Sequence, residues 1–496
     1  MTVLPCRPPL LGLPVLFSST LFLLLALPLV MLVYHLLPHL LRNTWLLLIS
    51  LVFYAWGEPR LLWVMLASMA GNYLLGLWMG RVYATPRAKA VLAVAVTANL
   101  ASLAWFKYAG WMAVSGNHLL QPLGLQLPVP QVVLPLGISF YTFHALSYVV
   151  DVYRGDAKVQ RDPTKIALYL ALYPQLIAGP ILRYHDMADQ LGRRQVRLDD
   201  LAYGLQRFVL GLAKKVLIAN TLARPADALF ALPHQELSAP LAWLAVVAYT
   251  GQIYFDFSGY SDMAVGLARM HGFVFTENFR WPYAAQDVRG FWRRWHISLS
   301  NWFRDYLYIP LGGNRASEGR TRINLLIVFL LCGLWHGAAW TFVAWGLWHG
   351  AFLALERTAW GTWLPRLPRP LRHTYALLVA MLGWVLFRAE TFEQATGMVV
   401  AMAGMAPGDT TRWSLALYLG RDVQLGLVVG AVASQPVLPW LGGHWQRWRS
   451  RGLGPAGHLA DGLLQAGTIA ALLLLLVASA VMLAAATHNP FIYFRF

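Results

Sequence analysis

Residues 463–486 read LLQAGTIAALLLLLVASAVMLAAA, and this stretch decides the class of fold. No charged side chain interrupts it, and about 20 apolar residues are enough to cross the hydrocarbon core of a bilayer. The whole chain agrees, because 58% of its 496 residues are hydrophobic and 12% are charged, whereas a soluble domain carries about 25% charged residues. Since a chain inside lipid must satisfy its own backbone hydrogen bonds, the sequence predicts an all-α, polytopic membrane protein.

Further apolar segments lie upstream of this stretch. We expect about 11–13 transmembrane or re-entrant helices, at residues 15–37, 45–56, 61–82, 90–106, 132–150, 166–178, 241–268, 323–334, 340–355, 375–387, 415–438 and 463–486. Several are too short to cross a bilayer directly, which favours tilted or re-entrant pieces that line an internal cavity. We find no linker between folded units, so residues 1–496 are expected to form one integral-membrane domain.

The basic residues indicate how the chain is oriented. The formal net charge is +17, and Lys and Arg gather at residues 81–89, 154–165, 183–215, 280–322, 357–372 and 447–451. Basic loops stay on the cytoplasmic side of a membrane. Segment 375–387 must then cross outward and 415–438 must return, and the last span, 463–486, places residues 487–496 outside. Three spans counted back from Arg81 also place the N-terminus outside, so both chain termini are predicted to be periplasmic. A nucleic-acid partner is not expected, since no basic face stands on a polar domain.

Residues 280–322 form the least apolar region of the chain. Eight arginines stand there against three acids, and aromatic residues recur every three or four positions, which is typical of amphipathic helices at a membrane surface. Because guanidinium groups recognise phosphates, Arg293, Arg294 and Arg304 are candidates to bind the phosphates of coenzyme A. Anchoring to anionic membrane lipids is the alternative interpretation, and the two can coexist.

His336 is the first candidate for catalysis, because an ionisable group within an apolar segment is costly and therefore often functional. An imidazole is also suited to take a proton from a sugar hydroxyl; the alternative is a buried histidine that only bonds a neighbouring helix. His296 lies in the arginine-rich segment upstream. His349 would lie roughly 220° round a continuous helix from His336, which indicates a structural or supporting role. No metal site is expected, because the histidines lack ligand spacing.

Two aspartates, Asp256 and Asp262, stand in the apolar segment 241–268. They are candidates to orient a histidine or a substrate hydroxyl, and the alternative is that they form buried ion pairs with Arg293, Arg294 or Arg304. Ser258, Trp335 and Trp340 are further candidates for the substrate passage. The chain lacks the Gly-x-Ser-x-Gly motif and phosphate-binding loops, so a covalent acyl-enzyme is not supported.

Several motifs resemble those of the membrane-bound O-acyltransferases. They are YFDFSGYSDMA at 254–264, FWRRWHISLS at 291–300 and GLWHG at 333–337. Further similarity lies in LPLGISFY at 134–141, IAGP at 177–180, DYLYIPLGGN at 305–314 and PFIYFRF at 490–496. More narrowly, the chain is similar to the membrane subunits that act on alginate, cellulose or peptidoglycan. The resemblance covers nearly the whole chain except residues 1–14, which would be an N-terminal extension.

The resemblance implies a many-helix fold in the bacterial inner membrane, with inner and outer funnels that meet at a thin waist or tunnel. His336 matches the family's active-site histidine, and His296 matches its second polar position. Acetyl-coenzyme A would be the donor on the cytoplasmic side, with no tightly bound cofactor. The acetyl group would pass to a periplasmic partner of the SGNH-hydrolase type, which the tail from Phe491 to Phe496 would dock, within a polysaccharide synthase and export complex.

The working hypothesis is that His336 deprotonates an acceptor hydroxyl, while His296 positions or polarises the reacting groups. The acceptor is either a serine of the partner or the sugar itself. The product would be an O-acetylated exported polysaccharide, cellulose or alginate, or alternatively peptidoglycan. A transporter or channel for an acyl or lipid-linked intermediate is a second hypothesis, since broken helices with polar residues suit it too. A non-catalytic scaffold is a third. Thioester turnover by the purified protein separates the enzyme from the other two.

Overall fold

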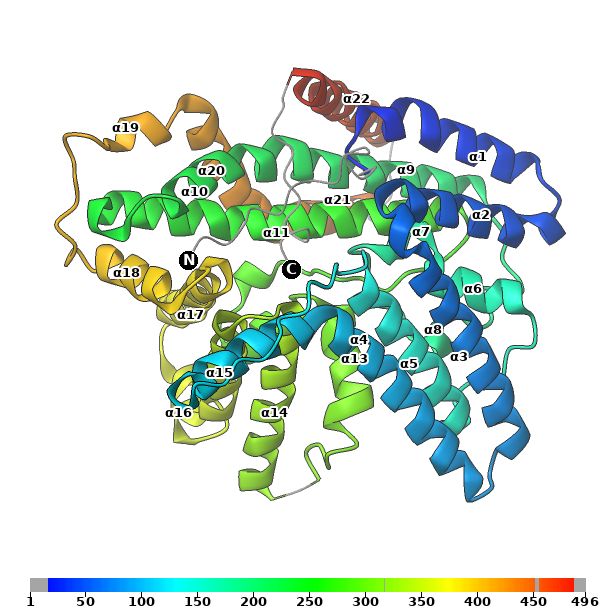
Figure 1. Ribbon diagram of the computed structural model, residues 1–496. Coiled ribbons are helices and arrows are strands. Elements are labelled where there is room, and N and C mark those ends of the chain that lie inside the picture. The colour runs from blue at the N-terminus through cyan, green and yellow to red at the C-terminus, as the bar shows by residue number, and fades with distance from the viewer. Residues whose placement is uncertain (1–16, 316, 451–454, 486–496) are drawn as a thin grey trace. The chain divides into compact units, whose positions relative to one another are not determined.

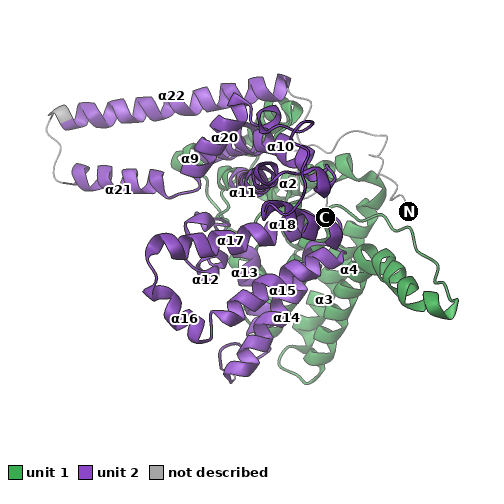
Figure 2. Cartoon of the chain, turned by 90° about the vertical axis from the view of Figure 1, so that its left-hand side faces the viewer, with its two compact units in different colours: residues 1–204, 264–275 green, residues 205–263, 276–496 purple. Residues whose placement is uncertain are grey.

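The computed structural model describes residues 17–315, 317–450 and 455–485, and every regular element within these ranges is a helix. The all-helical prediction is therefore confirmed for this part of the chain. Its contacts group into two compact units, residues 1–204 with 264–275 and residues 205–263 with 276–496 (Figure 2). Two long helices, α9 (Leu198–Ala213) and α11 (Ala239–Met270), run from one unit into the other, which explains why the sequence contains no linker.

Unit 1 contains the N-terminal helices, of which α2, α3 and α4 are the longest apolar ones. They are η1 (Phe22–Ala26), α1 (Leu27–Leu36), α2 (His39–Gly57), η2 (Pro59–Leu61), α3 (Leu62–Val82), α4 (Arg87–Leu120), η3 (Gln121–Leu123), α5 (Ile138–Arg154), α6 (Pro163–Ala171), α7 (Tyr173–Leu176) and α8 (Tyr184–Met187). Asn72 on α3 and Asn99 on α4 hydrogen bond each other through both amides, at 3.1 and 2.8 Å. The pair satisfies two polar side chains within apolar helices and links these helices, as is common in membrane proteins.

Unit 2 holds the remaining helices. They are η4 (Lys214–Ala219), α10 (Asn220–Phe230), η5 (His234–Glu236), η6 (Pro282–Ala284), α12 (Val288–Trp292), α13 (Ile297–Phe303), η7 (Arg304–Tyr308), α14 (Glu318–His336), α15 (Trp340–Leu355), α16 (Ala359–Trp363), η8 (Leu364–Arg366), α17 (Arg369–Arg388), α18 (Phe392–Met402), α19 (Leu415–Tyr418), α20 (Arg421–Ala433), α21 (Val437–Arg449) and α22 (Pro455–Ala485). Figure 1 shows α14 and α15 together with α17 in the part of this unit that holds the candidate site.

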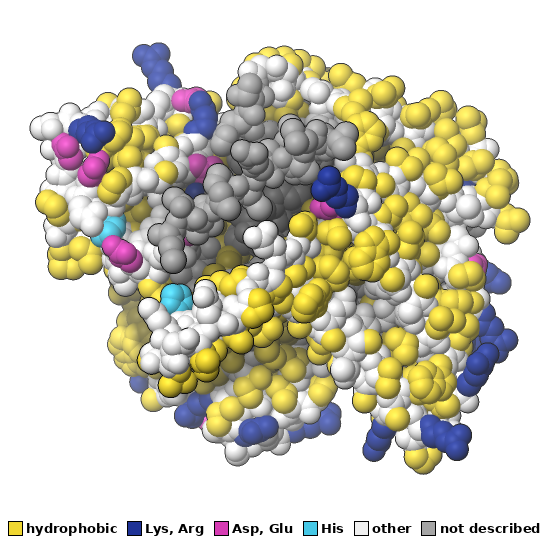
Figure 3. Space-filling view, in the orientation of Figure 1, with side chains coloured by type: hydrophobic (Ala, Val, Ile, Leu, Met, Phe, Trp, Pro, Cys, Tyr) yellow, Lys and Arg dark blue, Asp and Glu magenta, His cyan; other side chains and the backbone are white. Residues whose placement is uncertain are grey.

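Within the described ranges, five helices are long and apolar enough to cross a membrane: His39–Gly57, Pro59–Val82, Arg87–Leu123, Arg369–Arg388 and Gly457–Ala485. The bent pair α20 and α21 is a sixth candidate. Along α3 and α4 apolar side chains lie exposed, and basic side chains gather where α3 gives way to α4, next to Arg81 and Arg87 (Figure 3). An apolar surface bordered by basic residues is the arrangement of a membrane span with a cytoplasmic end.

Three expectations need correction. The expected single span at 415–438 is broken, since α19, α20 and α21 replace it and the last two meet at a 50° bend. Residues 198–215, which belong to the basic cluster expected to form a loop at 183–215, are helical. The helices expected on a membrane surface at 280–322 are short, and their aromatic side, including Phe291 of α12 and Trp302 of α13, is buried within unit 2.

Candidate active site

His336 is the last residue of α14, and its side chain is 5% exposed. The helix starts at Ser317, whose hydroxyl caps the backbone N–H of Arg320, and it ends where Gly337 turns to an extended conformation (φ −164°, ψ 156°). A helix end leaves backbone carbonyls without helical partners, so the imidazole sits at a polar break inside an apolar unit.

Aromatic rings surround the His336 imidazole. The ring centroids of Trp335, Trp345 and Phe387 lie 4.9, 5.0 and 5.1 Å from its own, all edge to face. This shell comes from α14, α15 and α17 and leaves the His336 side chain almost fully buried. Trp335 is therefore part of the site, whereas Trp340 at the start of α15 is 54% exposed.

The break after His336 turns α14 and α15 into a hairpin. Gly333 and Gly346 face each other at the crossing, where an added Cβ on Gly346 would meet the carbonyl oxygen of Phe329. Small residues of this kind let helix backbones approach closely. The premise of one continuous helix from His336 to His349 is therefore wrong, because the chain reverses at Gly337.

His349 packs against Trp345, which in turn packs against His336. Its centroid is 5.2 Å from Trp345 and 5.2 Å from Trp292, and the ring stacks on Phe291 at 6.1 Å and 7°. Both ring nitrogens are buried, and neither has a hydrogen-bond partner among the residues that the structure describes. His349 thus packs against the ring of Trp345, and its supporting role stays a prediction.

The second candidate histidine, His296, comes close to His336. The two ring centroids are 6.5 Å apart, and His296 is fully buried. His296 is also the residue before α13, with a left-handed backbone (φ 44°, ψ 54°), a conformation that costs about 1–3 kcal/mol outside glycine and clusters at functional sites. Its Nδ1 hydrogen bonds Oδ1 of Asn278 at 3.1 Å. The structure therefore unites the two histidines that the sequence placed 40 residues apart.

The two aspartates of α11 form ion pairs. Asp256 lies 2.7 Å from the ammonium of Lys215, with both side chains 2% exposed. Asp262 bonds Lys214 at 2.6 Å and Arg207 at 2.8 Å. The ion-pair interpretation is thus confirmed for both, but the basic partners come from residues 207–215 and not from the expected arginines.

Ser258, on the same helix, is fully buried, and its hydroxyl has no hydrogen-bond partner within the described part of the chain. The predicted place of Ser258 and the two aspartates in a substrate passage stays a prediction.

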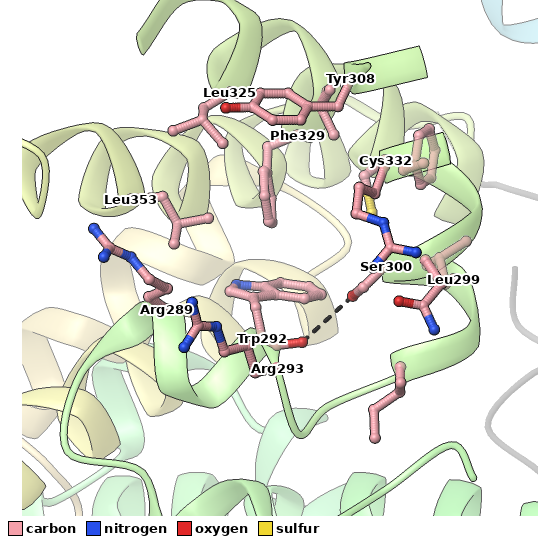
Figure 4. Close-up of a pocket in the computed structure, with 15 residues that line it drawn as sticks. Arg289, Trp292, Arg293, Leu299, Ser300, Tyr308, Leu325, Phe329, Cys332 and Leu353 are labelled. Atoms are coloured by element: carbon pink, nitrogen blue, oxygen red, sulfur yellow. Dashed lines mark hydrogen bonds between the residues drawn. The ribbon is translucent and has the colours of Figure 1, made fainter. Parts of the chain in front are cut away.

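A cavity of about 430 Å³ opens beside the histidines, between α12, α13, α14 and α15. Arg289, Arg293 and Arg304 line it together with Tyr308 and apolar side chains. In Figure 4 Arg289 and Arg293 extend from the same short helix, and Phe329 points from α14 toward Trp292, with 4.8 Å between ring centroids. Cationic groups over an apolar, aromatic floor suit a ligand that carries phosphates and a ring.

The cavity approaches the imidazole without reaching it. Cys332, one helical turn before His336, lines the cavity, as does Trp292, whose ring is 5.8 Å from Trp345. Of the three expected arginines, Arg293 and Arg304 line it and Arg294 does not. The tunnel expected to pass the histidine stays a prediction.

Glu356 holds the arginine-bearing helix α12 in place. Its carboxylate accepts hydrogen bonds from the backbone N–H groups of Val288 and Arg289, at 2.6 and 3.0 Å, and Tyr375 donates to it at 3.3 Å. A carboxylate at a helix start satisfies N–H groups that lack helical partners.

Three supporting residues, Arg289, Asn278 and Glu356, escaped the sequence analysis. Arg289 belongs to the same arginine-rich segment as Arg294, but Arg289 lines the cavity and Arg294 does not. Asn278 lies 18 residues before its histidine, and Glu356 lies 68 residues after Val288. A buried asparagine or glutamate has no local signature, so only the fold reveals these partners.

Known proteins resemble this chain over most of its length. Residues 160–387 match the model of the membrane-bound O-acyltransferase family. The chain is 43% identical to the probable alginate O-acetylase AlgI of Azotobacter vinelandii, over 97% of this chain and 100% of that protein. It is 34% identical to a peptidoglycan O-acetyltransferase of Helicobacter pylori, over 79% and 80% of the two chains. A teichoic acid D-alanyltransferase of Bacillus subtilis is 29% identical, over 41% and 54%.

Proposed function

Since this chain belongs to the membrane-bound O-acyltransferase family and is an O-acyltransferase, we propose that it transfers acetyl groups for the O-acetylation of an exported bacterial polysaccharide. The observation that carries the proposal is the meeting of His336 and His296 in a dry aromatic shell, one helical turn from an arginine-lined cavity. The donor is acetyl-coenzyme A, taken from the cytoplasmic side.

The cavity supports this donor by its chemistry. Arg289, Arg293 and Arg304 suit the phosphates, and the apolar wall of Phe329 and Trp292 suits the adenine or the pantetheine arm. Cys332, which lines the cavity, lies one helical turn before His336 on α14. The thioester would therefore arrive at the side of α14 that ends in His336.

The reaction requires one base and no covalent acyl-enzyme. The acceptor oxygen attacks the thioester carbonyl carbon while His336 takes the hydroxyl proton. The carbon–sulfur bond then breaks, and the imidazolium returns the proton to the leaving thiolate, so that coenzyme A is released as a thiol. Exclusion of water by Trp335, Trp345 and Phe387 protects the thioester from hydrolysis.

The acceptor side is proposed from the relatives. Alginate stands first among the polymers, because the probable alginate O-acetylase of Azotobacter vinelandii matches over its full length; cellulose and peptidoglycan are the other candidates. We propose that the chain lies in the bacterial inner membrane and works with a periplasmic SGNH-hydrolase-like acetyltransferase, within the polysaccharide synthase and export complex. The proposed docking tail from Phe491 to Phe496, the N-terminal extension at residues 1–14 and both termini lie outside the described residues.

The test is polymer acetylation in cells that carry His336→Ala. Because a general base contributes about 10²–10⁴ in rate, we expect acetyl release from the purified polymer by mild alkali to fall at least about 100-fold. His444→Ala is the matched control, since His444 is an exposed histidine on α21. Immunoblots of the membrane fraction should show equal protein. Unchanged acetyl content in the His336 variant would remove the assignment.

A further inference from the structure

Asn278 contacts His296 and the first residues of α13 through both of its oxygen atoms. Its side-chain oxygen receives His296 Nδ1 at 3.1 Å, the Ser298 backbone N–H at 3.2 Å and the Ser298 hydroxyl at 2.9 Å. Its backbone oxygen accepts from Ile297 N–H at 2.9 Å. Asn278 is 1% exposed and so makes these bonds in the protein interior.

These contacts determine where the proton of His296 sits. A backbone N–H can only donate, so the amide atom of Asn278 that faces Ser298 must be the carbonyl oxygen. The same oxygen faces Nδ1 of His296, which must therefore be the protonated nitrogen. A neutral imidazole carries one proton, so Nε2 bears the lone pair. Nε2 is buried and has no hydrogen-bond partner among the described residues.

Burial keeps the ring neutral. His296 lies outside the candidate membrane spans, and burial lowers the pKa of its imidazole to about 3. The titratable groups on the neighbouring elements include His336 on α14 and the aspartates of α11, which pair with Lys215, Lys214 and Arg207. Further such groups are Tyr254 and Tyr260 of α11, Cys332 of α14, and Arg293 and Arg294 just before His296. Glu277, next to Asn278, also pairs with Arg207.

The ring is also fixed in space. Phe257 meets it edge to face at 4.6 Å, and Phe279 stacks on it at 6.4 Å and 24°. The left-handed backbone of His296 is held by the two N–H groups that follow it, both bonded to Asn278. Asn278 thus supports both the strained turn and the direction of the ring.

We propose that Asn278 is a positioning residue that holds His296 as the Nδ1-protonated tautomer, so that His296 acts on the reaction only as a hydrogen-bond acceptor. The inference rests on the proposed function and specifies the role of His296 in the proposed acyl transfer. An acceptor nitrogen can orient the attacking hydroxyl, whereas polarising the thioester carbonyl would require a donor. Of the two roles considered for His296, positioning is therefore retained and polarisation is excluded.

The experiment compares two substitutions of Asn278 in purified protein that is supplied with acetyl-coenzyme A and an acceptor. Asn278→Asp keeps an acceptor opposite Nδ1 but adds a negative charge, which raises the pKa of the imidazole by about 1–3 units. Protonation places a hydrogen on Nε2, so activity should be lost as pH falls through the raised pKa. We expect a kcat close to that of the wild type at high pH. In the pH profile of kcat, the midpoint of the fall on the acid side should lie about one pH unit or more above that of the wild type.

Asn278→Leu removes the acceptor, and we expect kcat to fall about 10–100-fold at every pH, as when the supporting partner of a ligand histidine is lost. Asn324→Leu is the matched control, because Asn324 is a fully buried asparagine of α14 that bonds only the Leu311 carbonyl among the contacts that the structure describes for its side chain. It should keep kcat per folded protein within about twofold, and size-exclusion profiles report the folded fraction.

A wild-type pH profile for Asn278→Asp overturns the proposal, and so does a wild-type kcat for a folded Asn278→Leu. If Asn278→Leu fails to fold, the pH profile of Asn278→Asp still tests whether Asn278 positions His296. His336→Ala in the same assay separates this inference from the proposed function. An inactive His336→Ala with unaffected Asn278 variants removes only the inference, whereas an active His336→Ala removes the function itself.

Discussion

At the scale of single residues, the direction in which an arginine side chain points decides whether it can take part in the cavity. Arg293 and Arg294 are neighbours, yet only Arg293 lines the cavity, where Arg289 and Arg304 join it. The backbone oxygen of Arg294 instead accepts from Arg280 N–H at 2.9 Å. A guanidinium that contacts a bound phosphate stabilises the complex by about 1.5–3 kcal/mol, so adjacent arginines should differ clearly in their effect on donor binding.

We therefore expect Arg293→Ala and Arg304→Ala each to raise KM for acetyl-coenzyme A about tenfold with kcat nearly unchanged, because a charge-assisted contact is lost. Initial rates over a range of donor concentrations measure this. Arg294→Ala is the control, with a KM close to that of the wild type. Equal KM increases in all three variants would mean that the cavity is not the donor site.

Candidate residues were predictable from sequence where an unusual side chain stood in an apolar context. His336 is such a case, whereas His296 stood in the arginine-rich segment and was identified through its motif, and the fold places the two rings 6.5 Å apart. Asn278 and Glu356 were not predictable, because an amide or a carboxylate becomes informative only through partners brought to it by the fold. The partners of Asp256 and Asp262 were wrongly predicted for the same reason.

At the scale of elements, the α14–α15 hairpin sets the geometry of the site. Trp345 reaches His336 because Gly333 and Gly346 let the two helices approach. The apolar helices themselves were predictable from hydrophobicity. The separate apolar segments at 323–334 and 340–355 already left a gap around Gly337, but the reversal of the chain there was not predicted, because the position of His349 was judged on a continuous helix. Helix α9 was missed because it lies within the basic cluster at 183–215, although the helix itself carries a single arginine, Arg207.

Gly346→Ala tests the hairpin. The added Cβ would meet the Phe329 carbonyl oxygen on the facing backbone, which cannot move aside as a flexible side chain can. Such overpacking costs about 1–3 kcal/mol, so thermal unfolding in detergent should shift to lower temperature and acyl transfer should fall.

Gly442→Ala on α21 is the matched control for that substitution, because nothing lies within 4 Å of its added Cβ. It should keep the wild-type melting temperature or exceed it, since alanine favours a helix more than glycine does. Equal melting temperatures for the Gly346 variant and the wild type would contradict the close approach.

At the scale of the whole molecule, charge and apolar length together define the expected orientation. The turn between α3 and α4 lies among basic residues, whereas α17 is a candidate span that leads away from the basic cluster at 357–372. Under the positive-inside rule we expect the α3–α4 turn on the cytoplasmic side and the segment between α18 and α19 on the periplasmic side.

Single cysteines test this orientation after Cys6 and Cys332 are replaced by alanine. Thr85→Cys and Thr410→Cys introduce exposed thiols in the two segments. We expect a membrane-impermeant maleimide to label Thr85→Cys only in inverted inner-membrane vesicles and Thr410→Cys only in spheroplasts. Labelling of both from the same side would refute the predicted crossing by α17.

The most direct measurement of the central claim is the release of coenzyme A thiol from acetyl-coenzyme A by purified protein in the presence of an acceptor. The account predicts steady turnover by the wild type and a rate at least about 100-fold lower for folded His336→Ala. Equal thiol release by the two proteins, or none by either, would contradict an acyl transfer that depends on the imidazole at position 336.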